Sequence, residues 1–201
     1  MGPAGTRYGT ERDSTLEVKG KGMKFFWIMA CAVFFAGCSA KVEALHVEPQ
    51  NVAQLTSDLQ TLGDSVEYSE ARLFAYEALS YPQTLAERYG LVYPPSFHNL
   101  LINTGLKDRG LCYQWSEDMM VHLKSLRLQS FDLRWGVANK GELNEHNSVV
   151  VVAKGGAFQT GILIDPWRHS GVLYWAKVSE DPEYRWVENP SRSRYFGTIT
   201  Q

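Results

Sequence analysis

Three side chains of the types used in covalent catalysis are spread over the second half of the chain. Cys112 stands where an apolar pattern with helical spacing begins, and His146 opens a valine-rich run that is typical of a strand. Asp165 closes a second apolar run, Gly-Ile-Leu-Ile. A thiol, an imidazole and a carboxylate are the nucleophile, the base and the orienting group of a catalytic triad, so we predict these three residues as catalytic.

The predicted position of Cys112 favours a reactive thiolate. Unpaired backbone N–H groups and the helix dipole favour negative charge at a helix N-terminus, and thiols there can have a pKa lowered from about 8.5 to roughly 3.5–7.5. The backbone N–H of Cys112 would be one donor of an oxyanion hole, whose second donor the sequence does not identify. A cysteine also packs as a small buried hydrophobe, which is the alternative for this residue taken alone.

The pairing of His146 with Asp165 depends on how their two strands are joined. A two-residue turn at Gly155-Gly156, the tightest that the sequence allows, places His146 opposite Asp165 on one face of the sheet. The carboxylate then accepts the Nδ1–H of the ring and fixes its tautomer. A longer loop would shift this register.

The remaining histidines offer one rival for the role of base. His169 lies in a loop that follows Asp165 and is that rival. His98 and His122 lie on predicted helices, where a surface position or a satisfied buried position is the simpler interpretation. Cys, His and Asp are also zinc ligands, but three scattered ligands lack the close spacing of most zinc sites, and we expect neither a metal nor a cofactor.

The elements that must position these residues follow from the period of the apolar side chains. In the first half the spacing is helical, and Tyr81-Pro82 is expected to end the second helix. The predicted helices cover residues 51–62, 65–80, 83–89, 96–104 and 112–126.

The period changes to two after the last of these helices. The predicted strands cover residues 131–137, 147–153, 161–164 and 171–178, and the tail after Glu188 is expected to be a loop. Helices followed by consecutive strands predict an α+β fold, in which a helical N-terminal half packs on an antiparallel sheet.

The order of these residues on these elements resembles the transglutaminase-like branch of the papain-like cysteine-enzyme superfamily. The motifs are Gly110-Leu111-Cys112-Tyr113-Gln114-Trp115 at a helix start, His146 on a strand and Ile164-Asp165-Pro166 on the next, within residues 95–178. The resemblance implies a papain-like core with Cys112 as nucleophile, His146 as general base and acid, and Asp165 as orienting carboxylate. It also implies attack on a peptide or glutamine-like amide, a thioester intermediate, and release to water or an amine.

The N-terminal segment has the layout of a bacterial export signal. Lysines precede an apolar run from Phe25 to Gly37, which as a helix spans only about 20 Å of the roughly 30 Å that a membrane-spanning helix must cross. Phe35-Ala36-Gly37-Cys38 resembles the lipobox of bacterial lipoproteins, which implies acylation of Cys38. A plain secretory signal or an uncleaved anchor is the alternative, and Met23 is a plausible true start.

These features predict three segments: an extension and signal peptide over residues 1–37, a tether over 38–50 and a single domain over 51–201. The expected location is the bacterial cell envelope, lipid-anchored at the outer membrane and facing the periplasm. A formal charge of −2, from 20 Lys and Arg against 22 Asp and Glu, lacks the basic excess of nucleic-acid-binding proteins, so no nucleic acid is expected as a partner.

Two functions follow from the sequence. The first is an envelope lipoprotein that hydrolyses or transfers amide bonds of a peptide or protein, with cell-wall peptides among the substrates considered. The second is a non-catalytic module that uses the same fold to bind peptide or to assist assembly. A Cys112 of ordinary reactivity would distinguish the second from the first.

Overall fold

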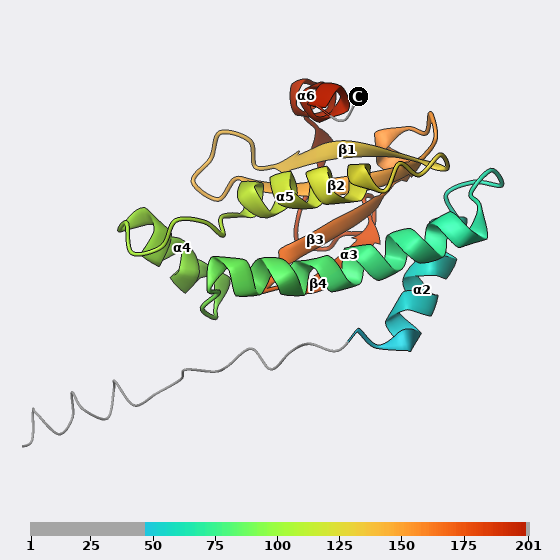
Figure 1. Cartoon of the computed structure of the whole chain (residues 1–201). Helices are drawn as coiled ribbons and strands as arrows, with labels where there is room; N and C mark the ends of the chain where they lie inside the picture. Colours follow the sequence, from blue (N-terminus) through green and yellow to red (C-terminus); the bar gives the residue numbers. More distant parts are fainter. Residues whose placement is uncertain (1–46, 200–201) are drawn as a thin grey trace, which may run out of the picture. The chain divides into compact units, whose positions relative to one another are not determined.

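The helices and the strands occupy separate parts of the chain, as the change in apolar spacing predicts. The computed structural model describes residues 47–199, in which four helices precede a five-stranded sheet and one further helix follows it (Figure 1). The predicted α+β class with an antiparallel sheet is confirmed. The helices are α2 (Pro49–Gln60), α3 (Tyr68–Tyr89), α4 (Pro95–Asn103), α5 (Cys112–Ser125) and α6 (Pro190–Ile199).

The sheet has the strand order β4-β3-β2-β1-β5, and every neighbouring pair is antiparallel. The strands are β1 (Phe131–Ala138), β2 (His146–Ala153), β3 (Ile162–His169), β4 (Val172–Lys177) and β5 (Val187–Glu188), with a short 3-10 helix η1 (Phe158–Thr160) between β2 and β3. The central strand β2 is buried along almost its whole length, which explains its continuous run of valines.

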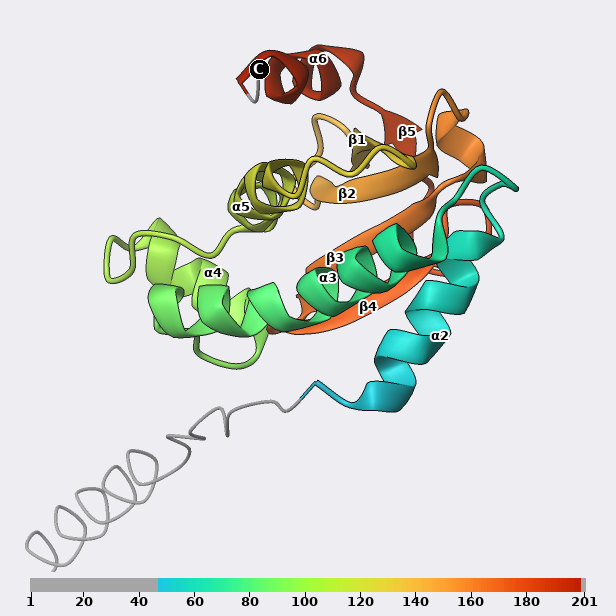
Figure 2. The same ribbon diagram turned by 45° about the vertical axis from the view of Figure 1, so that its right-hand side comes forward.

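Both faces of the sheet are covered, because alternate residues of β2 enter different apolar clusters. Val149 and Val151 belong to the larger cluster, which includes residues of α2, α3 and α5. Figure 2 shows α3 and α5 running along this face. Val150 and Val152 point to the opposite face of the sheet, where they form a smaller cluster with Trp186. This smaller cluster contains no residue of α2, α3 or α5. The two faces of β2 thus enter separate apolar clusters.

Helix α3 continues through Pro82, where the sequence analysis ended it, so that prediction is wrong. Proline in a helix interior removes one backbone hydrogen bond and costs about 3 kcal/mol. The apolar face continues on both sides, however, and Ala78, Leu85 and Pro82 itself are all buried. Burial of this face outweighs the cost, and the helix ends at Gly90 in the left-handed conformation (φ 55°).

The connection between β2 and β3 is longer than the predicted two-residue turn. Val150 pairs with Leu163, whereas a turn at Gly155-Gly156 would pair it with Gly161. The added length forms η1, whose Phe158 is buried in the smaller cluster. His146 is therefore not directly opposite Asp165, and that part of the prediction is wrong. A shift of two residues leaves each side chain on its predicted face.

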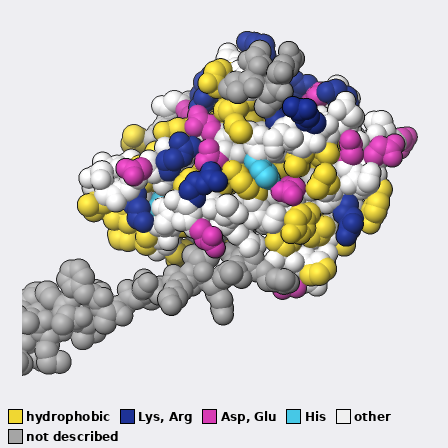
Figure 3. Space-filling view, viewed as in Figure 1, with side chains coloured by type: hydrophobic (Ala, Val, Ile, Leu, Met, Phe, Trp, Pro, Cys, Tyr) yellow, Lys and Arg dark blue, Asp and Glu magenta, His cyan; other side chains and the backbone are white. Residues whose placement is uncertain are grey.

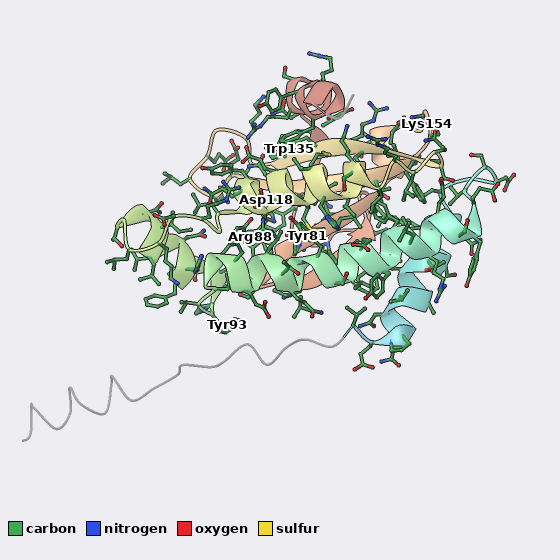
Figure 4. All side chains as sticks on the ribbon, in the orientation of Figure 1. Tyr81, Arg88, Tyr93, Asp118, Trp135 and Lys154 are labelled. Atoms are coloured by element: carbon green, nitrogen blue, oxygen red, sulfur yellow. The ribbon has the colours of Figure 1, made fainter. Side chains whose placement is uncertain are left out.

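The tail after Glu188 forms α6 rather than the predicted loop. Asn189 accepts a hydrogen bond from the N–H of Arg192 (3.3 Å), and Pro190 occupies the first helical position, where its missing N–H is harmless. Phe196 stacks on Trp135 of β1 with ring centroids 5.5 Å apart, and Figure 4 shows Trp135 beneath this helix. The cap and this contact explain why a short, polar segment is helical.

The predicted signal peptide, Cys38 and most of the predicted tether lie outside residues 47–199. Where the described part begins, α2 starts at Pro49, two residues before the predicted domain boundary. Within the described residues, the helices are too short or too polar to cross a membrane.

Candidate active site

Cys112 is the first residue of α5, as predicted, and its side chain is half-buried. The side chain of Gln114 closes the preceding turn, since its Oε1 accepts hydrogen bonds from the N–H groups of Gly110 (2.8 Å) and Leu111 (3.0 Å). The N–H groups of Cys112 and Tyr113 have no acceptor within the helix, because they lie in its first turn. These groups and the helix dipole favour negative charge at the sulfur.

His98 fixes the loop that leads into Cys112. The ring is fully buried, accepts a hydrogen bond at Nδ1 from the N–H of Val92 (3.2 Å) and donates from Nε2 to the carbonyl of Arg109 (2.9 Å). Gly110 packs against the ring so closely that a Cβ there would lie 2.3 Å from Nε2. His98 is therefore a satisfied structural residue, as the sequence analysis expected.

A second anchor joins the same loop to α3 and α5. Arg109 donates to Asp118 (3.0 Å), and the Tyr89 hydroxyl donates to the other carboxylate oxygen (2.6 Å). Figure 4 shows Asp118 on α5. Burial raises the pKa of Tyr89, and the neighbouring Asp118 raises it further, so this hydroxyl stays protonated and acts as a donor.

His146 and Asp165 form a buried pair. Their Nε2 and Oδ2 atoms are 2.7 Å apart, and the side chains are only 2% and 1% exposed. The prediction that these residues meet from neighbouring strands is confirmed, but the prediction that Nδ1 binds the carboxylate is wrong. Nδ1 is buried and has no partner of hydrogen-bond geometry among the described residues. Nδ1 is therefore the ring nitrogen that can exchange a proton with a group other than Asp165.

Cys112 lies close enough to His146 to affect its protonation. Burial alone lowers the pKa of His146, but the hydrogen bond and charge of Asp165, together with the nearby sulfur of Cys112, outweigh burial and raise it from 6.5 to about 9. The sulfur itself is aligned with the carbonyl oxygen of Glu145, at 3.7 Å, and not with Nδ1. The resting site thus holds the thiol beside the ring, without a well-aligned hydrogen bond between them.

Aromatic side chains enclose the imidazole. Its centroid lies 4.7 Å from that of Trp167, 4.8 Å from Tyr184 and 5.3 Å from Trp186. Trp167 in turn donates to the side chain of Asn99 on α4 (3.4 Å). This enclosure keeps water from the ring, and sequence reasoning missed Tyr184 and Trp186 because they lie in an irregular segment between β4 and β5.

Helix α4 and its flanking loops expose apolar side chains near the site. Tyr93, Phe97, Leu100 and Leu106 are exposed, and Figure 3 shows apolar side chains at the surface over α4. On the face shown there, acidic and basic side chains are interspersed. Exposed apolar side chains thus lie on the helix that Trp167 contacts through Asn99.

The other histidines take no part in this arrangement. His169 is exposed and contacts the edge of Tyr174, with centroids 5.8 Å apart. His122 pairs with Glu77 (2.7 Å) and stacks on Tyr81. Among residues 47–199, no group of three or more His, Cys, Asp or Glu side chains is arranged to hold a metal ion.

Arg168 was also missed by the sequence analysis. Its Nε donates to the same Asp165 oxygen that accepts from His146, at 3.2 Å. The feature of the sequence that indicates this contact is the position of Arg168 three residues after Asp165, because a buried arginine needs a negatively charged partner.

Comparison with known proteins finds no match to this chain among family models, curated proteins or solved structures. The function must therefore be inferred from the site itself.

Proposed function

We propose that this protein is a cysteine-dependent amide hydrolase or acyltransferase with a papain-like, transglutaminase-like core. The observation that carries the proposal is the buried His146–Asp165 pair beside a half-buried cysteine at a helix N-terminus. A structural cysteine requires none of these features. Together they supply a nucleophile, a proton carrier and an orienting carboxylate.

The reaction follows from the roles of these groups. The Cys112 thiolate attacks the amide carbonyl, with the first-turn N–H groups of α5 close to the developing oxyanion. The imidazolium of His146 gives its Nδ1 proton to the departing nitrogen as the C–N bond breaks, which leaves a thioester. Water or an amine then attacks the thioester, gives a proton to His146 and restores the thiolate.

The substrate class and the location are parts of the same proposal. The exposed apolar side chains of α4 support a peptide or protein as substrate rather than a highly charged molecule. The signal-like segment and the motif at Cys38 support a lipid-anchored protein of the bacterial envelope, facing the periplasm, where cell-wall peptides are available substrates.

Acylation by an activated ester tests the proposal without knowledge of the substrate. The protein would be incubated with p-nitrophenyl acetate, and the acetylated residue would be located by mass spectrometry. We expect a thioester at Cys112 that forms and hydrolyses, slow acylation in His146→Ala, and none at this position in Cys112→Ala. Peptide binding without any Cys112 acylation would overturn the proposal and favour the non-catalytic module.

A further inference from the structure

A buried charge network extends behind the proposed catalytic carboxylate. Arg168 donates from Nε to Asp165 (3.2 Å) and from its two terminal nitrogens to Asp181 (3.1 and 2.7 Å). The side chains of Arg168, Asp165 and Asp181 are only 6%, 1% and 0% exposed. Burial of a charged side chain costs free energy unless the charge is paired. The three side chains meet this condition, because each charge is hydrogen-bonded to an opposite charge.

Asp181 is itself held in place. It accepts hydrogen bonds from the indole of Trp186 (2.8 Å) and from the backbone N–H of Glu183 (2.9 Å). The guanidinium lies over Tyr174 and Tyr184, 4.0 and 4.9 Å from their centroids. Trp186 and Tyr184 also enclose His146, so the network and the imidazole share the same walls.

The geometry at Asp165 gives Arg168 a role in the chemistry. Oδ2 of Asp165 accepts from both His146 and Arg168, so a fixed guanidinium also fixes the direction in which the carboxylate meets the ring. Resting on the function proposed above, we propose that Arg168, oriented by Asp181, is a positioning residue that aligns Asp165 and limits how strongly the imidazolium is stabilised.

The second part of this role is electrostatic. An imidazolium that is stabilised too strongly cannot give its proton to a leaving group. The positive charge of Arg168 opposes protonation of His146, and the negative charge of Asp181 partly cancels that effect. The titratable groups that face the ring are Cys112 from α5, Asp165 from β3 and Tyr184 from the segment before β5. Behind them lie Arg168 and Asp181, and the exposed carboxylate of Glu183 lies 3.8 Å from Arg168.

Two substitutions should therefore move the pKa of His146 in opposite directions. Asp181→Asn removes the negative charge and keeps one of the two acceptor oxygens, so we expect the pKa of His146 to fall by about half a unit or more. Arg168→Lys keeps the charge but not the planar fork, and its ammonium cannot reach both carboxylates at once. Asp181 accepts two of the three side-chain hydrogen bonds of Arg168 and Asp165 accepts one, so we expect the ammonium to stay with Asp181. The pKa of His146 should then rise by a similar amount, because positive charge moves away from Asp165.

The pKa would be measured by NMR titration of the His146 ring in the full chain. Glu180→Gln removes an exposed carboxylate that pairs with Lys177 and is the matched control. We expect the pKa of His146 in this control to equal that of the wild type. In Arg168→Lys, p-nitrophenyl acetate should also acylate Cys112 at least about tenfold more slowly than in the wild type. Thermal unfolding identifies any variant that fails to fold, and the other variant then decides the outcome.

Shifts of the same sign in both variants, or no shift in a folded variant, would overturn the role of Arg168. This result is distinguishable from failure of the proposed function. The NMR titration requires no catalysis, whereas an unreactive Cys112 in the wild-type protein counts against the proposed function alone.

Discussion

Sγ of Cys112 lies 3.7 Å from the carbonyl oxygen of Glu145, the residue immediately before His146. The N-terminus of α5 thus contacts the residue that leads into β2, although the two partners are 33 positions apart in the sequence. Cys112 is the first residue of α5 and His146 the first residue of β2, and these two elements pack on one another in the larger apolar cluster. Several consequences of this arrangement are measurable.

The first concerns the protonation of His146. Asp165→Asn removes the carboxylate that raises the pKa of His146, while burial, which lowers that pKa, remains. We expect the pKa to fall well below 9 in an NMR titration of the ring, because only Cys112 then opposes the effect of burial. Asp58→Asn, which removes a carboxylate bonded to Trp175 instead, is the control. A pKa that stays near 9 without Asp165 would show that the pair does not control the ring.

The second concerns stability in acid. Burial raises the pKa of Asp181, but hydrogen bonds from Arg168 and Trp186 outweigh it and lower the pKa from 3.8 to about 2. A carboxyl with a lower pKa in the folded state stabilises the protein above its unfolded pKa, and this contribution is lost as the pH falls from about 4 to 2.

Urea unfolding of wild type and Asp181→Asn would measure this contribution. The wild type should be the more stable at pH 5, and its advantage should shrink by about 2 kcal/mol by pH 2. An advantage that is constant over this range would contradict the pairing of Asp181 with Arg168.

The third concerns the loop that holds Cys112. Gly110 has a φ of 129°, and a Cβ there would lie 2.3 Å from the buried ring of His98. Gly110→Ala should therefore destabilise the protein by about 2 kcal/mol or more and slow Cys112 acylation, because the loop must move. Gly105→Ala is the matched control, since Gly105 also has a positive φ (75°) but nothing lies within 4 Å of its added Cβ.

In that comparison, thermal unfolding and acylation would be measured on both variants. The control should lose only the cost of its backbone conformation, about 1 kcal/mol, and keep its acylation rate. Equal losses in the two variants would mean that the contact with His98 is unimportant.

Local patterns in the sequence predicted much of the arrangement around Cys112. The helix start at Cys112, the strand that begins at His146 and the faces of β2 all follow from apolar spacing, which reports burial directly. The length of the β2–β3 connection did not follow, because two glycines allow a tight turn but do not require it. The burial of Phe158 by the rest of the fold decided the longer loop.

The surroundings of the site were harder to predict for a related reason. Asp181, Tyr184 and Trp186 lie between β4 and β5 in a segment without regular secondary structure. Such a segment has no period from which a facing residue can be inferred. Likewise, Pro82 inside α3 reflects tertiary packing that outweighs a local preference.

The rate at which iodoacetamide alkylates Cys112 at pH 6 tests the central claim most directly. At this pH the imidazolium of His146 is present beside the sulfur of Cys112, since the pKa of His146 is about 9. We expect alkylation at least about tenfold faster in the folded wild type than in the urea-unfolded chain, and loss of this difference in His146→Ala. A folded Cys112 that reacts no faster than the unfolded one would contradict the account.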